Sequence, residues 1–306
     1  MLRFLAQRLF QSVLILLGVT IITFGLLFLI PADPVRMIAG RSATPETVES
    51  IRHQLGLDQP IPVQYLRYLG NLVQGDMGRS YVQKAQVSEL IASRLPATLQ
   101  LMLAAIFFEL LIGLPAGIYA STRRDRASDK IVMVCSLIGV SAPQFVVGLL
   151  LIYVFAYKLE LFPLGGYGTI WHVVLPALTL GVTIAGWYSR MSRSSMIDVL
   201  RQDYIRTARA KGVAEWRVVV VHGLRNAILP IVAMIGIDIG LYAQGVVVVE
   251  AVFGWPGIGQ LAWFAIQRID IPIIMAVTLV AAIGIVIGNL LADIATSLID
   301  PRVQHG

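Results

Sequence analysis

Apolar runs of membrane-spanning length recur along the chain. The hydrocarbon core of a bilayer is about 30 Å thick, so a helix that crosses it needs roughly 20 mostly apolar residues. Six segments approach or exceed this length, namely residues 9–30, 99–120, 131–157, 173–188, 229–249 and 273–298. The fourth is the shortest and the weakest, because it holds Pro176, Gly181 and Gly186. The pattern predicts an all-α membrane protein with six transmembrane helices.

Arg3 and Arg8 precede the first apolar run, as basic residues do in a secretory signal peptide. The run is too long for the apolar region of such a peptide, and no small-x-small cleavage site follows it. Pro31 and Pro34 follow instead and are typical of a helix end. The sequence therefore predicts that residues 1–30 form an anchor helix that stays in the membrane.

Lysine and arginine in short loops indicate the orientation of a membrane protein, because such loops stay in the cytoplasm. Six spans place both termini on one side. The loops on that side hold Arg3, Arg8, Arg123, Arg124, Arg126, Lys130, Arg190, Arg193, Arg201, Arg206, Arg209, Lys211, Arg217, Arg225 and Arg302. The short loops on the other side hold little beyond Lys158 and Arg268. Both termini are therefore expected in the cytoplasm.

Two long polar segments separate the apolar runs. The outer one carries helix signals: Thr44 and Pro45 predict a helix start, Gly56 predicts its end, and residues 61–73 can form a second helix. The inner one, residues 190–226, is strongly basic. The expected organisation is an anchor helix over 1–30, an outer loop over 31–94, a five-helix transmembrane core over 95–298 that includes the loop 190–226, and a cytoplasmic tail over 299–306.

Composition agrees with a membrane location. Of the 306 residues, 57% are hydrophobic and 14% are charged, whereas about a quarter of the residues in a soluble domain are charged. The net charge of +6 matters less than its place in the inner loops. The single cysteine, Cys135, excludes an intramolecular disulfide and says nothing about the redox compartment.

Motifs for nucleotide binding and catalysis are absent from the sequence. No G-x-x-x-x-G-K-[ST], G-x-S-x-G or H-E-x-x-H occurs. Residues 257–262 fit G-x-G-x-x-A, but no βαβ unit surrounds them. The four histidines show no metal-ligand spacing, and the basic inner loop lacks the interleaved aromatics of a nucleic-acid site. We expect no catalytic residue, cofactor, metal or nucleic-acid partner.

Ionisable residues inside a span are functional candidates, because each costs about 2.5–3.5 kcal/mol on insertion scales. Glu109 and Asp238 lie in the middle of their spans. Both are candidates for a translocation path that meets a solute amine, and both could instead pair with a neighbouring helix. Asp293 lies near the inner end of the last span and is expected to be structural.

Glycines recur at four-residue spacing in three spans. The pairs are Gly113 and Gly117, Gly236 and Gly240, and Gly284 and Gly288. Small residues at this spacing let two membrane helices approach closely. The pairs therefore predict a tightly packed bundle rather than independent anchors.

The inner loop contains a short helical segment. Asp203 stands near its positive end, basic residues stand toward its negative end, and Gly212 stops it. Small residues at Ala208 and Ala210 would let another backbone come close. Attraction to anionic membrane lipid explains the charges but not this run of small residues. Because so short a polar helix is unstable alone, it needs a partner surface.

This segment resembles the EAA loop of ABC-importer permeases, in the branch that imports dipeptides, oligopeptides, glutathione and nickel chelates. Arg206, Thr207 and Ala208 stand at the EAA triad, and Gly212 stands at its glycine. Arginine replaces the usual glutamate, and the distance from Gly212 to Pro230 exceeds the general spacing; both are features of that branch. Further resemblances lie in residues 55–60, 75–80, 141–145 and 250–259, and in the closing Asn289, Asp293 and 300–302.

The resemblance implies a type I ABC-importer permease of a bacterial inner membrane, the first of two permease subunits. It also implies a second related permease, two ATP-binding subunits and an extracytoplasmic solute-binding protein as partners. Since those subunits hydrolyse ATP, the chain itself is not an enzyme. In this family the loop forms a coupling helix that docks on the ATPase, here through Asp203, Tyr204, Arg206, Thr207, Ala208, Arg209, Ala210, Lys211 and Gly212.

The expected function is ATP-driven import of peptides, with dipeptides first and glutathione or nickel chelates as alternatives. An ion-coupled secondary transporter is the alternative of another class. It predicts repeat halves with matching broken helices, and the six expected spans show no such symmetry. Uptake that survives collapse of the membrane potential but not ATP depletion separates the two.

Overall fold

The computed structural model describes residues 2–29, 35, 44–54 and 56–299. The helices are α1 (Leu2–Leu29), α3 (Pro45–Gln54), α4 (Ile61–Val73), α5 (Val87–Thr122), α6 (Ala127–Ser141), α7 (Gln144–Leu151), α8 (Ile170–Leu200), α9 (Asp203–Ala210), α10 (Glu215–Arg217), α11 (Leu224–Ala227), α12 (Leu229–Ala243), α13 (Val247–Phe253), α14 (Ile258–Gln267) and α15 (Ile271–Ile299). Two π-helical turns, Ile152–Lys158 and Val218–Gly223, continue α7 and precede α11. The fold is helical, as expected, and the β structure among these residues is a single bridge between Arg79 and Gln86.

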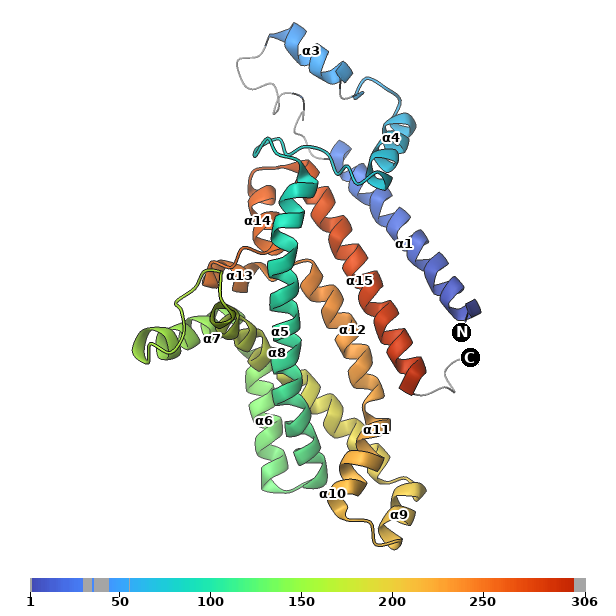
Figure 1. Cartoon of the computed structure of the whole chain (residues 1–306), viewed down its shortest axis with the longest axis vertical. Coiled ribbons are helices and arrows are strands. Elements are labelled where there is room, and N and C mark those ends of the chain that lie inside the picture. Colours follow the sequence, from blue (N-terminus) through green and yellow to red (C-terminus); the bar gives the residue numbers. More distant parts are fainter. Residues whose placement is uncertain (1, 30–34, 36–43, 55, 300–306) are drawn as a thin grey trace.

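Among the described residues, four helices are long and apolar enough to cross a membrane unbroken: α1, α5, α8 and α15. Three bent pairs also qualify, with bends of 100° between α6 and α7, 52° before α12 and 99° between α13 and α14. In Figure 1, α5, α12 and α15 run along the long axis of the molecule, α3 and α4 lie at one end, and α9 and α10 lie at the other. The outer loop and the basic inner loop therefore lie at opposite ends of the bundle.

The outer loop begins as its sequence predicts. The backbone N–H of Thr47 donates to Oγ1 of Thr44 over 3.3 Å, which caps the start of α3. Gly56 adopts φ +66° just past the end of this helix. The second helix, α4, has the predicted bounds. The expected helix end at Pro31 and Pro34, and the tail after residue 299, lie outside the described residues.

The fourth span is longer than predicted. Its helix α8 has 31 residues and continues to Leu200, well into the segment expected to be an inner loop. The glycines expected to weaken it are contact points instead. A Cβ on Gly181 would lie 2.5 Å from Cβ of Phe108 on α5, and one on Gly186 would lie 2.3 Å from the carbonyl oxygen of Ser136 on α6. Close packing on two neighbours thus stabilises a helix whose own sequence is weak.

The third and fifth spans are interrupted, contrary to expectation. Pro143 breaks the third, because the residue before a proline avoids the helical region; Ala142 accordingly adopts φ −73° and ψ 128°. The fifth was expected to reach residue 249, but α12 ends at Ala243. Gly245 there adopts φ +88°, and it lies so close to Gly259 that a Cβ on it would be 2.0 Å from that backbone nitrogen. The chain then forms the α13–α14 hairpin, which was not predicted.

The glycine pairs lie at helix contacts, as predicted. A Cβ on Gly113 would come within 2.6 Å of the carbonyl oxygen of Ala185 on α8. Gly236 and Gly288 face one another across α12 and α15, where a Cβ on Gly288 would lie 2.3 Å from the carbonyl oxygen of Gly236. The α5–α8 and α12–α15 contacts are therefore close backbone contacts of the kind that small residues permit.

Charged pairs tie the ends of the helices together. Arg8 of α1 reaches Asp293 of α15 through Nε at 3.0 Å and Nη2 at 3.2 Å, which supports the structural role predicted for that aspartate. Arg193 of α8 donates to both oxygens of Asp129 on α6, each over 2.6 Å. Such bidentate arginine–carboxylate pairs fix geometry as well as contributing energy. They hold α1 and α6 against the core.

Candidate functional site

The helix α9 forms from Asp203 to Ala210, as the sequence predicts. Asp203 stands in its first turn and pairs with Arg206 over 2.9 Å. Gly212 adopts φ +76° just past its end, and the backbone N–H of Val213 donates to the carbonyl of Ala208 over 3.2 Å. This reversal is typical of a glycine-terminated helix. It turns the chain back toward α10.

One side of α9 is fixed to the rest of the chain. Ile205 is fully buried. The hydroxyl of Tyr204 accepts a hydrogen bond from Nδ2 of Asn226 over 2.7 Å and lies 3.4 Å from the carbonyl oxygen of His222. These contacts join α9 to the segment that leads through α11 into α12. The anchored side of α9 is therefore linked, within this chain, to a helix of the bundle core.

The other side of α9 is open. The exposed residues on this side are Asp203, Arg206, Thr207 and Ala210, followed by Lys211 and Gly212, whereas Ala208 is half-buried. The hydroxyl of Thr207 donates to the carbonyl of Asp203 over 3.0 Å, so it is already satisfied within the helix. The face thus combines small side chains with charges that this chain leaves accessible.

Arg209 fixes the angle between α9 and α10. Its Nη2 lies 2.7 Å from Oε1 of Glu215 and its Nε lies 3.1 Å from Oε2. The hydrogen bonds to Glu215 raise the pKa of the Arg209 guanidinium above its ordinary value. All nine residues expected to couple to an ATPase therefore lie on one compact helix–turn unit.

The two intramembrane acids lie in one buried network. Glu109 of α5 accepts a hydrogen bond from the hydroxyl of Tyr242, and Asp238 accepts one from the hydroxyl of Tyr188 on α8. Glu109 is fully buried and Asp238 is 8% exposed. The second oxygen of Glu109, Oε2, is buried without a hydrogen-bond partner among the described residues. The network joins α5, α8 and α12 and presents no open surface in this conformation.

The tyrosines of this network were not singled out from the sequence. Asp238 and Tyr242 are four residues apart and share a face of α12, which is a readable signal. The place of Tyr188 in the network cannot be seen from the sequence, because it depends on how α8 packs on its neighbours. Its hydrogen bond to Asp238 therefore depends on tertiary structure alone.

Glu250 is a further buried acid, and sequence reasoning gave it no role. Its side chain is fully buried in the α13–α14 hairpin. Its oxygens accept the backbone N–H groups of Val246 over 3.1 Å and Gln260 over 2.6 Å. Cβ atoms on Gly257 and Gly259 would lie 2.3 and 3.0 Å from this carboxylate. The two glycines of the G-x-G-x-x-A match therefore make room for a carboxylate, not for a dinucleotide.

The hairpin is attached to α5 by two further hydrogen bonds. Nε1 of Trp255 donates to the carbonyl of Ala97 over 3.0 Å, and the backbone N–H of Ile258 donates to Oγ1 of Thr98 over 2.8 Å. Trp255 and Thr98 are both buried. The position of the hairpin in the bundle is thus set by buried polar contacts.

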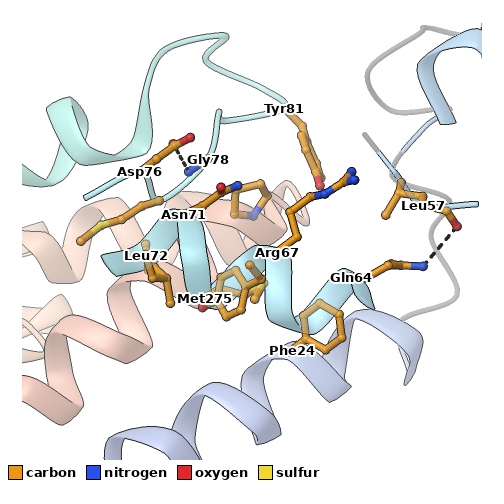
Figure 2. A pocket seen from close by; sticks show the side chains of 14 residues that line it. Phe24, Leu57, Gln64, Arg67, Asn71, Leu72, Asp76, Gly78, Tyr81 and Met275 are labelled. Atoms are coloured by element: carbon orange, nitrogen blue, oxygen red, sulfur yellow. Dashed lines mark hydrogen bonds between the residues drawn. The ribbon is translucent and has the colours of Figure 1, made fainter. Parts of the chain in front are cut away.

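A cavity of about 210 Å³ lies at the outer end of the molecule. Figure 2 shows Phe24 of α1 and Met275 of α15 on its apolar side, with Arg67 and Asn71 of α4 above them. Gln64 there donates to the carbonyl oxygens of Leu57 and Gln59 over 3.2 and 2.8 Å. The outer loop therefore closes over the ends of α1 and α15.

Comparison with known proteins agrees with this architecture. Residues 113–305 match the family described as "Binding-protein-dependent transport system inner membrane component", and residues 1–102 match its N-terminal membrane component. The chain is 41% identical over 305 residues to the glutathione transport system permease protein GsiC of Salmonella paratyphi A and 40% identical to that of Escherichia coli K12, with full coverage of both chains. An inward-facing structure of the MetNI methionine ABC transporter superposes with a TM-score of 0.58 at 18% identity, over 69% of this chain and 96% of that one.

The match to the MetNI structure shows the fold. The matches to the family models and to the two permeases show the family. Together with the helical bundle and its apolar spans, they place the chain in the inner membrane. An ion-coupled secondary transporter is thereby set aside. The chain belongs to the binding-protein-dependent transport system inner membrane components, the permease subunits of ABC importers.

Proposed function

We propose that this chain is one of two related permease subunits of an importer for glutathione. Two ATP-binding subunits drive the complex, and an extracytoplasmic solute-binding protein delivers the solute. The observation that carries the mechanism is the helix α9, which is anchored through Tyr204 and Ile205 and exposed on its opposite side. The relatives named as glutathione permeases support the choice of solute.

The mechanism depends on the exposed face of α9. A partner can shift the conformation of the bundle only if it binds two states with different free energies. Closure of the ATPase dimer would supply that difference by pressing on Ala208, Ala210 and Gly212, where small side chains permit close contact. Because α9 connects through Asn226 to α11 and α12, the push moves α12 together with α15. Rocking of the bundle then opens a midplane site to alternate sides.

The solute is tested by competition. The complete complex is reconstituted in proteoliposomes with ATP inside and its binding protein outside, and uptake of labelled glutathione is measured against excess dipeptide or nickel chelate. We expect glutathione uptake that withstands collapse of the membrane potential, ceases without ATP and is little affected by either competitor. Dipeptide uptake that excess glutathione does not reduce would support the first expectation from the sequence instead.

We also propose that Glu109 and Asp238 border the translocation path and meet a solute amine when the helices move apart. The support is their depth in the bundle and the unpartnered Oε2 of Glu109. Asp238→Asn keeps an acceptor for Tyr188 but removes the charge. We expect KM for uptake to rise about tenfold, which corresponds to about 1.4 kcal/mol.

The control for this prediction is Tyr188→Phe, which removes the hydrogen bond and keeps the carboxylate. We expect it to lower the thermal stability of the complex more than it changes KM. An unchanged KM in Asp238→Asn, together with lowered stability, would assign the network to helix packing alone.

A further inference from the structure

A second cavity lies beside the coupling helix at the cytoplasmic end of the bundle. Its volume is about 270 Å³, and its walls come from the end of α5, the end of α8, α9 and α10. Its charged lining residues are Arg124, Arg201, Arg209 and Glu215. We propose that this cavity binds a phosphoryl group, carried by an anionic phospholipid or by a soluble phosphate compound.

The arginines of this cavity come from three separate segments of the chain. Arg124 follows α5, Arg201 caps the end of α8, and Arg209 lies in α9. Arg124 pairs with Asp125 over 3.4 Å and Arg209 pairs with Glu215, so positive charge remains in excess even when both acids are counted. The planar guanidinium binds phosphate oxygens in pairs and keeps its charge at all relevant pH values. Three arginines that line one cavity are therefore suited to binding a phosphate.

The cavity also has an apolar wall. Ile197 and Leu200 of α8 line it and are half-buried. The α5 wall begins where the second apolar span ends, at residues 121–124. A basic pocket between helices at the cytoplasmic surface is a typical site for an anionic lipid headgroup. The apolar wall would receive the glycerol and the first methylenes of the lipid.

Occupancy of this cavity would change the coupling helix. Arg209 belongs to α9, and its present partner is Glu215. A phosphoryl group beside Arg124 and Arg201 attracts Arg209 as well, and it competes with Glu215. The bound anion thus ties α9 to the ends of α5 and α8. Transport would then depend on anionic lipid or on soluble phosphate; this consequence rests on the coupling role proposed above, whereas binding itself does not.

The test measures lipid retention by the complete purified complex. The complex is placed in nanodiscs with phosphatidylglycerol diluted in phosphatidylcholine, and retained phosphatidylglycerol is counted by native mass spectrometry. Arg124→Gln and Arg201→Gln should each weaken retention about fivefold, which corresponds to about 1 kcal/mol, because each removes a guanidinium that lines the cavity. Arg123→Gln is the matched control, because it removes the same charge one position away, from a side chain that stacks over Tyr119 at 4.9 Å.

A second variant distinguishes a specific loss of lipid binding from misfolding. Glu215→Gln removes the competing carboxylate, so it should increase retention, which a damaged protein would not do. Inorganic phosphate is added in a parallel series: if it reduces retention by the wild type and not by Arg124→Gln, the source of the phosphoryl group can be soluble.

Equal retention by Arg124→Gln, Arg201→Gln and Arg123→Gln, without any effect of phosphate, would overturn the proposal. The outcome is separable from the coupling role. Ala208→Glu should abolish uptake and leave lipid retention unchanged.

Discussion

Replacing Gly212 by glutamate is expected to abolish uptake while the chain still inserts into the membrane. Gly212 adopts φ +76°, and no atom lies within 4 Å of the place that a Cβ would take, so the reversal after α9 requires glycine for its backbone and not for space. A glutamate adds strain of roughly 1 kcal/mol and an unpaired charge at the partner surface. A buried charge without a partner costs about 3–5 kcal/mol. The affinity of the partner surface for α9 should therefore fall more than a hundredfold. Uptake and membrane content are measured in the same cells.

Gly75→Glu is the matched control for this substitution. Gly75 is an exposed glycine with φ +81° and equally open surroundings, but it lies in the outer loop. It therefore carries the same strain and charge at the opposite end of the molecule. Ala208→Glu repeats the test within the helix without any glycine strain. Wild-type uptake in both α9 variants, or an equal loss in Gly75→Glu, contradicts the coupling role.

Replacing Glu250 by alanine is expected to give the largest loss of stability. The carboxylate accepts the N–H groups of Val246 and Gln260 in a fully buried setting. Each donor left without a partner costs about 1–3 kcal/mol, so the loss of the two hydrogen bonds should cost about 2–6 kcal/mol. Thermal unfolding of the solubilised complex measures this loss, and disulfide trapping of the hairpin against α5 measures its position.

The intermediate variant is Glu250→Gln, which keeps one acceptor oxygen and turns a donor toward the other N–H group. Its stability should lie between those of the wild type and Glu250→Ala. Glu89→Ala removes an exposed carboxylate from the first turn of α5 and should leave stability within about 0.5 kcal/mol of the wild type. A Glu250→Ala complex as stable as Glu89→Ala would show that packing and the hydrogen bonds to α5 hold the hairpin without this carboxylate.

Local signals predicted the short helices well. The start and end of α9 follow from Asp203 and Gly212, and the bounds of α4 and the cap of α3 follow from residues within a few positions. In each case the determining interaction lies within one or two turns of the chain. The glycine pairs were also readable, since close approach needs small residues on the same face of a helix.

The features that could not be predicted from the sequence depend on contacts beyond the local chain. The length of α8 depends on its close contacts with Phe108 and Ser136, and the hairpin depends on Glu250 meeting residues up to ten positions away. In the hydropathy pattern, Val246 and Val247 simply extend the fifth apolar run. The hydrogen-bond partners of Glu109 and Asp238 are tyrosines from two different helices. Only Tyr242 could be found from the sequence, because it lies four residues after Asp238 on the same helix.

Site-directed cross-linking of α9 in the assembled complex tests the coupling role most directly. Cys135 is first replaced by serine, because it is exposed, and single cysteines are then introduced at Thr207 and Lys211, with Lys84 of the outer loop as the control position. A coupling role predicts that both α9 positions cross-link to the ATP-hydrolysing subunit with an efficiency that changes when ATP is bound, and that position 84 does not. Cross-links from α9 that never include that subunit would contradict it.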